Sequence, residues 1–336
     1  MSTGDRRGRF VWHERMTNDV PSTLRYYESV VGWKSERWPD NPDYTLLVGA
    51  KGPSAGVMVL SDDARAMGAP PHWLSYIEVG DVDSSVARAT EFGARVLVPA
   101  QDIPKVGRFA VLQDPFGATF AVYTPSGPPM SGDDMALGSF SWHELTTTDP
   151  EAALGFYARM FGWEELTRMP MGPEGDYLIF GTAGVQLGGI YRKPAQLPGP
   201  PSWLPYANVA DCKRAAGLIA SRGGSVTNGP MEVPGGTWIV QGIDPEGVMF
   251  ALHAPAKAAR AKNASPGAKQ AAGRKTTKKK PAKKPAKKAA ARKPVKRKPL
   301  KRKPAKKAPR RKVAARRKAK PARRKPAARR RPAKKK

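Results

Sequence analysis

The segment FVWHERMTNDVPSTLRYYESVVGW, residues 10–33, returns in the second half of the chain as FSWHELTTTDPEAALGFYARMFGW, residues 140–163. The same offset of 130 positions gives identical counterparts to further landmarks, namely Trp73, Tyr76, Asp81, Gly93, Pro104 and the Asp114-Pro115-x-Gly117 turn. A constant offset over glycine, proline and aromatic positions means that the same turns and core contacts are specified twice. The chain therefore contains one module twice, and a site built into the module should appear in both copies.

The net charge of +31 combines two regions of opposite sign. Residues 256–336 hold 39 of the 59 Lys and Arg residues and none of the 28 acidic residues, so residues 1–255 carry a net charge of −8. Such an asymmetry points to a polyanionic partner for the basic end. The single cysteine, Cys212, excludes an internal disulfide framework and fits a reducing compartment. With no apolar run of the roughly 18–20 residues that span a bilayer, the expected location is cytoplasmic, without a membrane partner.

Each copy is predicted to fold as two successive strand–helix–three-strand units. The first helix of each copy is expected to begin after a capping aspartate, Asp19 or Asp149, and to end at Gly32 or Gly162. The strands expected in the first copy cover residues 10–16, 44–48, 57–60, 73–79, 96–98, 108–112 and 119–123.

These units, the phrase Tyr26-Tyr27…Val31-Gly32-Trp33 and the Asp-Pro-x-Gly hairpin resemble the vicinal oxygen chelate superfamily, which includes glyoxalase I, extradiol dioxygenases, and fosfomycin- and bleomycin-resistance proteins. The resemblance implies an α+β fold in which two tandem modules, each of paired βαβββ units, form cup-shaped sheets. We accordingly expect module 1 at 8–127, a linker at 128–137, module 2 at 138–255 and a disordered basic tail at 256–336. Because the superfamily includes isomerases, dioxygenases, transferases and binding proteins, the fold does not by itself fix an activity.

In metal-using members of that superfamily, four inward-facing side chains, typically His, Glu or Gln, hold a divalent cation. The resemblance places three of these positions at Trp12, Leu74 and Ala121, and in the second copy at Trp142, Leu204 and Ala251. The fourth position lies on the strand that closes the first half, where neither 45–60 nor 177–191 contains Asp, Glu or His. Because a divalent ion needs several oxygen or imidazole donors, both cups are predicted to hold no metal and no cofactor, and the six positions remain candidates for lining a ligand pocket.

The repeated Trp-His-Glu sequence offers the other candidate pocket residues. Strand alternation puts Trp12 and Glu14 on one face of the first strand and His13 on the other, and Trp142 and Glu144 repeat the pattern. In one interpretation the glutamates point into the cups as polar anchors or general bases for a ligand held by the tryptophans. In the other, Trp and Glu line a module–module interface, or the glutamate pairs with an arginine such as Arg108.

No other residue type forms a repeated constellation that would carry catalysis, and no catalytic residue is assigned. Asp114 and Asp244 are interpreted as structural residues of their turns, since aspartate before proline and glycine favours such turns. Cys212 has no repeated histidine partner and is interpreted as a packed cysteine.

The basic tail consists almost entirely of Lys, Arg, Ala and Pro, without an aromatic residue. Its dense prolines forbid a continuous helix and its composition forbids a core, so the tail is expected to be disordered and extended. It resembles the C-terminal tails of linker histones. We expect non-specific DNA binding by counterion release, through Lys278, Lys279, Lys280, Lys283, Lys284, Lys287, Lys288, Lys296, Arg297, Lys298, Lys301, Arg302, Lys303, Arg310, Arg311, Arg316, Arg317, Arg323, Arg324, Arg329, Arg330 and Arg331.

The sequence thus predicts a metal-free protein that binds a small molecule in each module and is tethered to the nucleoid by its tail. Two alternatives stay open: an enzyme of the glyoxalase or dioxygenase type that the tail merely localises, and a purely architectural nucleoid protein. The absent metal ligands weigh against the first alternative, and the repeated Trp-x-Glu weighs against the second.

Overall fold

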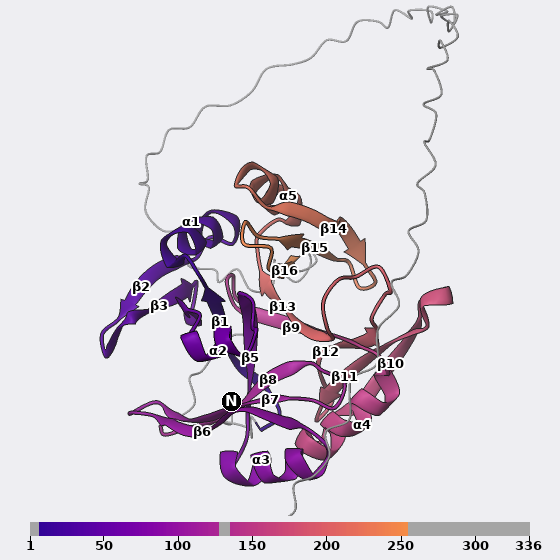
Figure 1. The fold of residues 1–336 in the computed structure, drawn as a ribbon. Helices are drawn as coiled ribbons and strands as arrows, with labels where there is room; N and C mark the ends of the chain where they lie inside the picture. Colours follow the sequence, from indigo (N-terminus) through magenta and orange to yellow (C-terminus); the bar gives the residue numbers. More distant parts are fainter. Residues whose placement is uncertain (1–6, 128–134, 255–336) are drawn as a thin grey trace, which may run out of the picture. The chain divides into compact units, whose positions relative to one another are not determined.

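The computed structural model describes residues 7–127 and 135–254, which fold into two eight-stranded sheets with helices (Figure 1). The predicted linker is described only from residue 135 onwards, and the predicted tail at 256–336 lies outside the described residues. The predicted fold class, α+β with two tandem modules of curled sheets, is confirmed.

The two modules have the same order of strands and long helices. Module 1 comprises β1 (Phe10–Thr17), α1 (Val20–Val30), β2 (Lys34–Trp38), β3 (Asn41–Gly49), β4 (Gly52–Val59), α2 (Asp62–Ala66), β5 (His72–Glu78), α3 (Val82–Glu91), β6 (Arg95–Ile103), β7 (Gly107–Gln113) and β8 (Thr119–Pro125). Module 2 comprises β9 (Phe140–Thr147), α4 (Pro150–Phe161), β10 (Glu164–Pro170), the 3-10 turn η1 (Gly172–Glu174), β11 (Asp176–Thr182), β12 (Val185–Arg192), β13 (Ser202–Asn208), α5 (Cys212–Ser221), β14 (Ser225–Val233), β15 (Thr237–Ile243) and β16 (Met249–Ala254).

The first strand of each module lies at the centre of its sheet. In module 1 the order is β2-β3-β4-β1-β5-β8-β7-β6, and β10-β11-β12-β9-β13-β16-β15-β14 repeats it in module 2. β1 runs parallel to β4 and antiparallel to β5, so Glu14 has Gly56 as its neighbour on one side and Leu74 on the other. Each sheet therefore joins its two half-modules along a central pair of strands, and residues of the first strand occupy the middle of the curled surface.

The outer strands β2 and β10 were not predicted from the sequence. Each pairs with a single neighbour at the sheet edge, and most of their side chains are exposed. An edge strand without a buried face shows no alternation of apolar and polar residues, which is the signal that locates strands in a sequence. The short α2 and η1 are likewise absent from the sequence-based prediction, and β6 extends well beyond the three residues expected at 96–98.

Aspartate capping fixes the starts of the long helices. Asp19 accepts a hydrogen bond from the Ser22 backbone N–H and Asp149 accepts one from that of Ala152, as predicted for both helices. Gly162 ends α4 in the left-handed conformation with φ 71°, which a residue with a side chain rarely adopts.

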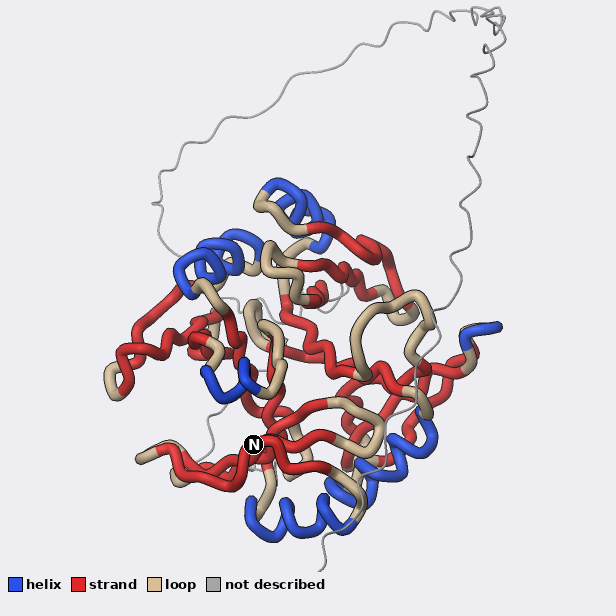
Figure 2. The backbone as a smooth tube through the Cα atoms, viewed as in Figure 1, coloured by secondary structure: helices blue, strands red, loops and turns tan. Residues whose placement is uncertain are grey.

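Two large apolar cores hold the described chain together, and both modules contribute to each. One core joins the second half of module 1, including Ile77 and Phe120, to the first half of module 2, including Tyr157. The other joins the first half of module 1, including Tyr27, to the second half of module 2, including Phe250. The helices accordingly meet in two pairs, α1 with α5 and α3 with α4 (Figure 2). Because each core is completed by the other module, neither module buries its own apolar surface alone.

A buried hydrogen-bond relay crosses between the modules within each core. Trp73 Nε1 donates to the Tyr27 hydroxyl at 3.1 Å, and that hydroxyl donates to Asp244 Oδ2 at 3.0 Å. The relay at the other end runs with the same geometry from Trp203 through Tyr157 to Asp114. A buried network with satisfied partners fixes the alignment of the surfaces that it joins, since a lost partner leaves a polar group unpaired away from water.

The aspartates of the two turns therefore stabilise both their own turn and the contact between the modules. Asp244 Oδ1 accepts the backbone N–H groups of Glu246 and Val248, which confirms the structural turn role expected from the sequence. Its other oxygen binds Tyr27 of the opposite module, a contact that sequence reasoning does not supply.

One end of the interface adds an ionic cluster that the other end lacks. Arg15 is fully buried and reaches Asp244 at 2.7 Å and Glu246 at 2.8 Å. Its counterpart 130 positions later is Leu145, which packs in the opposite core. The two ends thus share the relay and differ in the residue that covers it.

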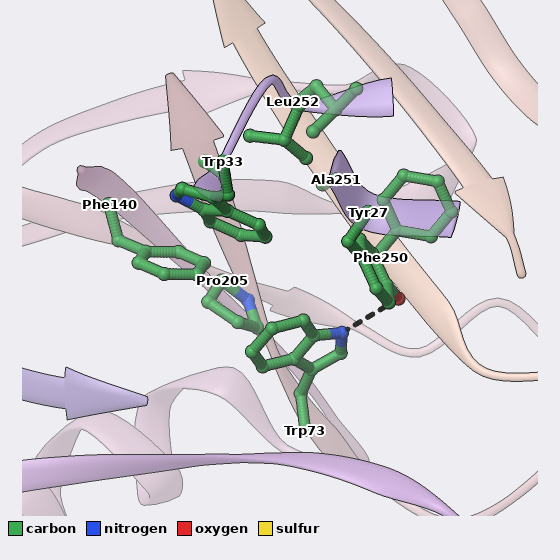
Figure 3. Close-up of a pocket in the computed structure, with 10 residues that line it drawn as sticks. Tyr27, Trp33, Trp73, Phe140, Pro205, Phe250, Ala251 and Leu252 are labelled. Atoms are coloured by element: carbon green, nitrogen blue, oxygen red, sulfur yellow. Dashed lines mark hydrogen bonds between the residues drawn. The ribbon is translucent and has the colours of Figure 1, made fainter. Parts of the chain in front are cut away.

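A small void of about 10 Å³ lies beside the relay. Its lining consists mainly of aromatic and aliphatic side chains, which include Trp33, Trp73 and Phe140 (Figure 3). A space of this size holds at most about one water molecule, and its lining offers few polar partners for one. It is a packing gap between the modules and has no room for a ligand.

A pair of buried histidines lies on the axis that relates the modules. His13 Nε2 and His143 Nε2 are 2.8 Å apart, and Phe140 and Phe10 stack on the two rings at 3.9 and 3.7 Å. His143 Nδ1 lies 3.3 Å from the Leu187 carbonyl oxygen, so it carries the proton there and its Nε2 accepts from His13. Burial lowers the pKa of His13 and takes that of His143 to about 3, so both imidazoles are neutral near pH 7.

We expect the folded protein to lose stability on acidification below about pH 6.5 because of this pair. Unfolded histidine takes up a proton near pH 6.5 whereas the buried pair does not, so each ring contributes stability above that pH and loses about 1.4 kcal/mol per unit as the pH falls towards its folded pKa. His13→Gln keeps a donor for His143 and removes one titrating ring. Its urea-unfolding free energy should fall less steeply between pH 6.5 and 4.5 than that of the unaltered chain, by up to about 1.4 kcal/mol per unit.

His143→Gln is the matched variant and should give the same change in slope. Equal slopes for all three proteins would show that the pair is already protonated in the folded state, contrary to the geometry of the two rings.

Candidate functional site

A buried carboxylate lies at the centre of the module 1 cup and accepts hydrogen bonds from two tyrosines. Glu14 accepts the Tyr44 hydroxyl at Oε1 (2.8 Å) and the Tyr76 hydroxyl at Oε2 (2.6 Å). Trp12 Nε1 donates to the Tyr44 hydroxyl at 2.8 Å, so Tyr44 both accepts and donates. Trp12 and Glu14 lie on the cup side of the sheet, while His13 between them lies on the opposite side and contacts the other module.

A glycine makes room for this arrangement. A Cβ atom on Gly56, the strand neighbour of Glu14, would lie 1.9 Å from the Tyr44 hydroxyl oxygen, closer than any real contact. Gly189 stands in the same relation to Tyr177, whose ring would come within 1.9 Å of an added Cβ. In both modules a tyrosine ring from β3 or β11 therefore lies over the bare backbone of a glycine on the next strand, β4 or β12.

The second cup repeats the cluster almost atom for atom. Glu144 accepts the hydroxyls of Tyr177 at 2.8 Å and Tyr206 at 2.6 Å, and Trp142 donates to Tyr177 at 2.9 Å. One additional group is present, because Gln241 Nε2 lies 3.2 Å from Glu144 Oε2 and also reaches the Tyr206 hydroxyl.

The corresponding residue of module 1 is the apolar Val111. The cup of module 2 thus carries one more hydrogen-bonding side chain beside its carboxylate than the cup of module 1.

Burial dominates the electrostatics of both clusters. It raises the pKa of Glu14 and of Glu144, while the tyrosine hydrogen bonds act in the opposite direction. Burial and the adjacent carboxylate also hold the pKa of Tyr44 and Tyr76 well above the usual value, so both hydroxyls stay protonated and act as donors. Each carboxylate oxygen thus binds one tyrosine hydroxyl and keeps a second lone pair, as the contact of Gln241 with Glu144 Oε2 shows in module 2.

Apolar side chains line the rest of each cup. In module 1 the buried Leu74, Tyr76, Val111 and Ala121 carry an outer layer of partly exposed residues, which are Trp12, Met16, Leu97, Val98, Phe109 and Tyr123. In module 2 a smaller layer of Trp142, Ile239 and Met249 covers Leu204, Tyr206 and Ala251. An apolar concave surface with a few polar groups at its base is typical of small-molecule sites.

The structure brings together the pocket candidates that the sequence selects. Trp12, Glu14, Leu74 and Ala121 share one cup, and the second cup holds Trp142, Glu144, Leu204 and Ala251. The alternative that the Trp-x-Glu residues line the module interface is wrong, because the histidines take that place.

The proposed partnership of Glu14 with Arg108 is also wrong. Arg108 lies nearer the surface and pairs with Asp83 and Asp102 at 2.8 and 2.9 Å. Alternation along β1 and β7 directs the two side chains to different partners, and the tyrosines supply the hydrogen bonds that an arginine would otherwise provide.

The tyrosines and Gln241 are functional candidates that sequence reasoning misses. Tyr76 and Tyr206 do obey the offset of 130, but Tyr44 and Tyr177 are 133 positions apart, as are Gly56 and Gly189. The second module has three more residues before these positions, so a search at constant offset does not align them. Allowing a gap within the repeat would have revealed both pairs.

The donor set of the cups does not fit a divalent metal ion. Trp12, Leu74 and Ala121 have no strong donor, and the one carboxylate nearby, Glu14, already binds two hydroxyls. Across residues 7–127 and 135–254, no three His, Cys, Asp or Glu side chains converge in a way that could hold a metal. Within the same ranges no helix is long and apolar enough to cross a bilayer.

Comparisons with known sequences match both modules to one family. The sequence profile of the Glyoxalase/Bleomycin resistance protein/Dioxygenase superfamily matches residues 9–122 and again residues 139–252. CFP32 of Mycobacterium tuberculosis (strain CDC 1551 / Oshkosh), whose name carries a provisional glyoxylase assignment, is 28% identical over 258 residues, which cover 75% of this chain and 96% of CFP32. The anthracycline biosynthesis protein DauV of Streptomyces sp. (strain C5) is 27% identical over 269 residues, or 72% of this chain and 91% of DauV.

Solved structures share the fold at low sequence identity. The 2,3-dioxygenase LapB from Pseudomonas sp. KL28 has a TM-score of 0.51 and 12% identity, over 74% of this chain and 92% of LapB. The Mn(II)-bound glyoxalase from Novosphingobium aromaticivorans has a TM-score of 0.50 and 14% identity, over 74% of this chain and 82% of that glyoxalase. At these identities the likeness concerns the fold alone.

Tyr44→Phe should destabilise the protein by about 1–3 kcal/mol, because it leaves both the Trp12 indole N–H and one Glu14 oxygen without their partner. Tyr177→Phe should do the same in the second cup. The measurement is urea unfolding at pH 7 followed by far-ultraviolet circular dichroism. Tyr191→Phe is the control, since the Tyr191 hydroxyl forms no hydrogen bond with a described residue, and it should change stability by no more than about 0.5 kcal/mol. A Tyr44 variant as stable as the control would show that the cluster does not hold the cup.

Proposed function

The chain belongs to the Glyoxalase/Bleomycin resistance protein/Dioxygenase superfamily, and we propose that it binds small apolar molecules in its two cups without a metal, while its basic tail binds DNA. The tail would keep these ligand-binding modules at the nucleoid. The two parts of the proposal rest on different observations and are tested separately.

One observation carries the proposal for the cups. Both modules place a buried glutamate where it accepts two tyrosine hydroxyls, and the positions around it hold tryptophan, leucine, alanine and glycine. This pattern is maintained twice in one chain even though the modules differ at Val111 and Gln241. Such a surface has apolar area for binding and few groups for metal-assisted chemistry.

The names of the relatives agree with a role in small-molecule chemistry. CFP32 carries a provisional glyoxylase name and DauV is named for anthracycline biosynthesis, and the matched regions extend over both modules of this chain. We infer from the partly exposed Trp12, Phe109 and Tyr123 that the ligand of the first cup is a flat, largely apolar molecule.

Charge carries the proposal for the tail. Residues 256–336 hold 39 basic residues and no acidic one, against a net charge of −8 on residues 1–255. A polycation of this kind binds the phosphate backbone by releasing condensed counterions, without reading sequence. The acidic modules repel phosphate, so the tail would supply nearly all of the affinity for DNA.

A second candidate function is proton-transfer catalysis in the cup of module 2. Gln241 and Tyr206 contact the same oxygen of Glu144, and burial raises the pKa of that glutamate, which is the direction that general acid or base catalysis needs. Glu144→Gln would then abolish a turnover that Glu14→Gln leaves intact. Equal effects of the two substitutions would favour binding alone.

The cups should bind a neutral apolar dye, Nile red, in protein that holds less than 0.1 equivalent of any divalent metal per module. A neutral dye avoids the charge of the tail, and treatment with chelator should leave its affinity unchanged. Phe109→Lys in the first cup and Ile239→Lys in the second should each weaken one class of dye site about tenfold or more, since a charge must then be desolvated.

Val59→Lys is the control, because Val59 is already 48% exposed on the surface, and it should have no effect on dye binding. Elemental analysis that finds one metal ion per module, removed by chelator together with ligand binding, would overturn the proposal for the cups.

The full chain should bind duplex DNA of any sequence with an affinity that falls steeply with salt. If a third of the 39 charges contact phosphates, the slope of log affinity against log salt is roughly −10 or steeper. Replacing the six basic residues within 296–303 by Gln should reduce the slope in proportion, as measured by fluorescence anisotropy from 50 to 400 mM salt.

A scrambled tail of the same composition should bind as well as the natural order, because counterion release depends on charge alone. Loss of affinity on scrambling, or full affinity in residues 1–255, would exclude the electrostatic tether.

A further inference from the structure

An open groove of about 360 Å³ lies between the modules, away from both cups. Helix α1 contributes Arg25, Tyr26, Glu28 and two serines, while Arg222, just beyond α5, closes the other side. The two helices are neighbours in the structure (Figure 1). The groove thus combines two arginines, one carboxylate and several hydroxyls at a boundary that both modules form.

Tyr26 is the unusual member of this groove. It is only 4% exposed, and its enclosed hydroxyl makes no hydrogen bond to any described residue. A buried hydroxyl without a partner opposes folding, so such a group calls for a reason. The neighbouring Glu28 carboxylate does not bind the Tyr26 hydroxyl, because it accepts the Ser35 hydroxyl instead.

The opposite end of the molecule shows that the fold does not need this hydroxyl. The counterpart of Tyr26 is Phe156, which packs in the equivalent core with the same ring and no polar atom. The residue facing it changes in step: a Cβ on Gly224 would lie 2.4 Å from the Tyr26 hydroxyl, whereas the counterpart of Gly224 is Ala94. One end thus accommodates a hydroxyl where the other accommodates a methyl group.

The charged residues of the groove also differ between the two ends of the molecule. Arg25 and Arg222 are exposed, and neither forms an ion pair with a described residue. Their counterparts are Gly155 and Phe92, so the equivalent surface has no such pair of cations, and Arg159 there lies over the Phe92 ring at 3.4 Å. The pair of exposed arginines and the buried tyrosine hydroxyl thus occur together at one end only.

We propose that this groove binds a phosphate-sized oxyanion, such as the phosphate group of a small metabolite, between Arg25 and Arg222, with the Tyr26 hydroxyl as a hydrogen-bond donor. Two guanidinium groups outweigh the Glu28 carboxylate, Arg15 compensates the nearby Asp244 carboxylate, and guanidinium forks match the geometry of phosphate. Because the hydroxyl is enclosed, contact between it and the anion requires the surrounding groove to open. This site is independent of the cups and of the DNA-binding tail.

The test compares thermal unfolding of full-length variants in inorganic phosphate and in chloride of equal ionic strength. The basic tail is identical in all variants, so its own phosphate binding cancels. The unaltered chain should show an increase in Tm with phosphate, because a ligand of the folded state alone stabilises it. Tyr26→Phe, which installs the residue of the other end, should weaken the apparent phosphate affinity about tenfold, and Arg222→Phe should remove the shift.

Two controls separate the site from general effects. Arg95→Ala removes an exposed arginine elsewhere and should keep the full phosphate shift. In chloride, Tyr26→Phe should unfold at the same temperature as the unaltered chain or a few degrees higher, since it removes an unpaired buried hydroxyl.

Each contrary result overturns the proposal. An equal phosphate shift in the unaltered chain and Tyr26→Phe would remove the hydroxyl from the site, and no shift beyond chloride would remove the site itself. A Tm several degrees lower for Tyr26→Phe in chloride would show that the hydroxyl serves folding. If the Tyr26 and Arg222 variants lost affinity for duplex DNA, the groove would belong to nucleic acid and not to a small anion.

Discussion

Neither module of this chain can close its own core, and the rest of the structure depends on that constraint. The helices of each module find their apolar cover in the other, so folding and module pairing are one event. The Trp–Tyr–Asp relay gives this apolar exchange a fixed alignment, because a small slip would strand a buried tyrosine hydroxyl and a buried carboxylate together. Because these contacts fix how the modules pair, the residues on the concave faces of the sheets do not have to contact the other module.

Duplication shows which parts of the module were free to change. The relay, the helix caps and the glutamate–tyrosine clusters occur in both copies, whereas the residues around them diverge. Gln241 of module 2 corresponds to Val111 of module 1, and Tyr26 of module 1 corresponds to Phe156 of module 2. Each pair differs in polarity, and Tyr26 and Phe156 also keep the same ring, so two sites of one fold can acquire different chemistry without a new scaffold.

The sequence predicts what repeats at a constant spacing and is governed by local rules. The caps at Asp19 and Asp149 and the sheet-facing placement of Glu14 follow from backbone hydrogen-bonding needs and strand alternation. Partners distant in the chain do not follow from such rules, which is why Tyr44 is absent from the predicted site although Tyr76, at the constant offset, was among the landmarks. The edge strand β2 is missed for a related reason, since it buries no face that would leave a pattern in the chain.

The unequal ends of the interface make the two modules non-interchangeable. If two copies of module 2 paired with each other, Leu145 would cover Asp244 and Glu246, and both carboxylates would lose the cation that Arg15 provides. If two copies of module 1 paired, Arg15 would meet Asp114 and the apolar Phe116 in place of a second acid. A symmetric dimer of either module would therefore lack a matched interface, and the complete set of contacts needs one copy of each module, which a single chain supplies in equal number.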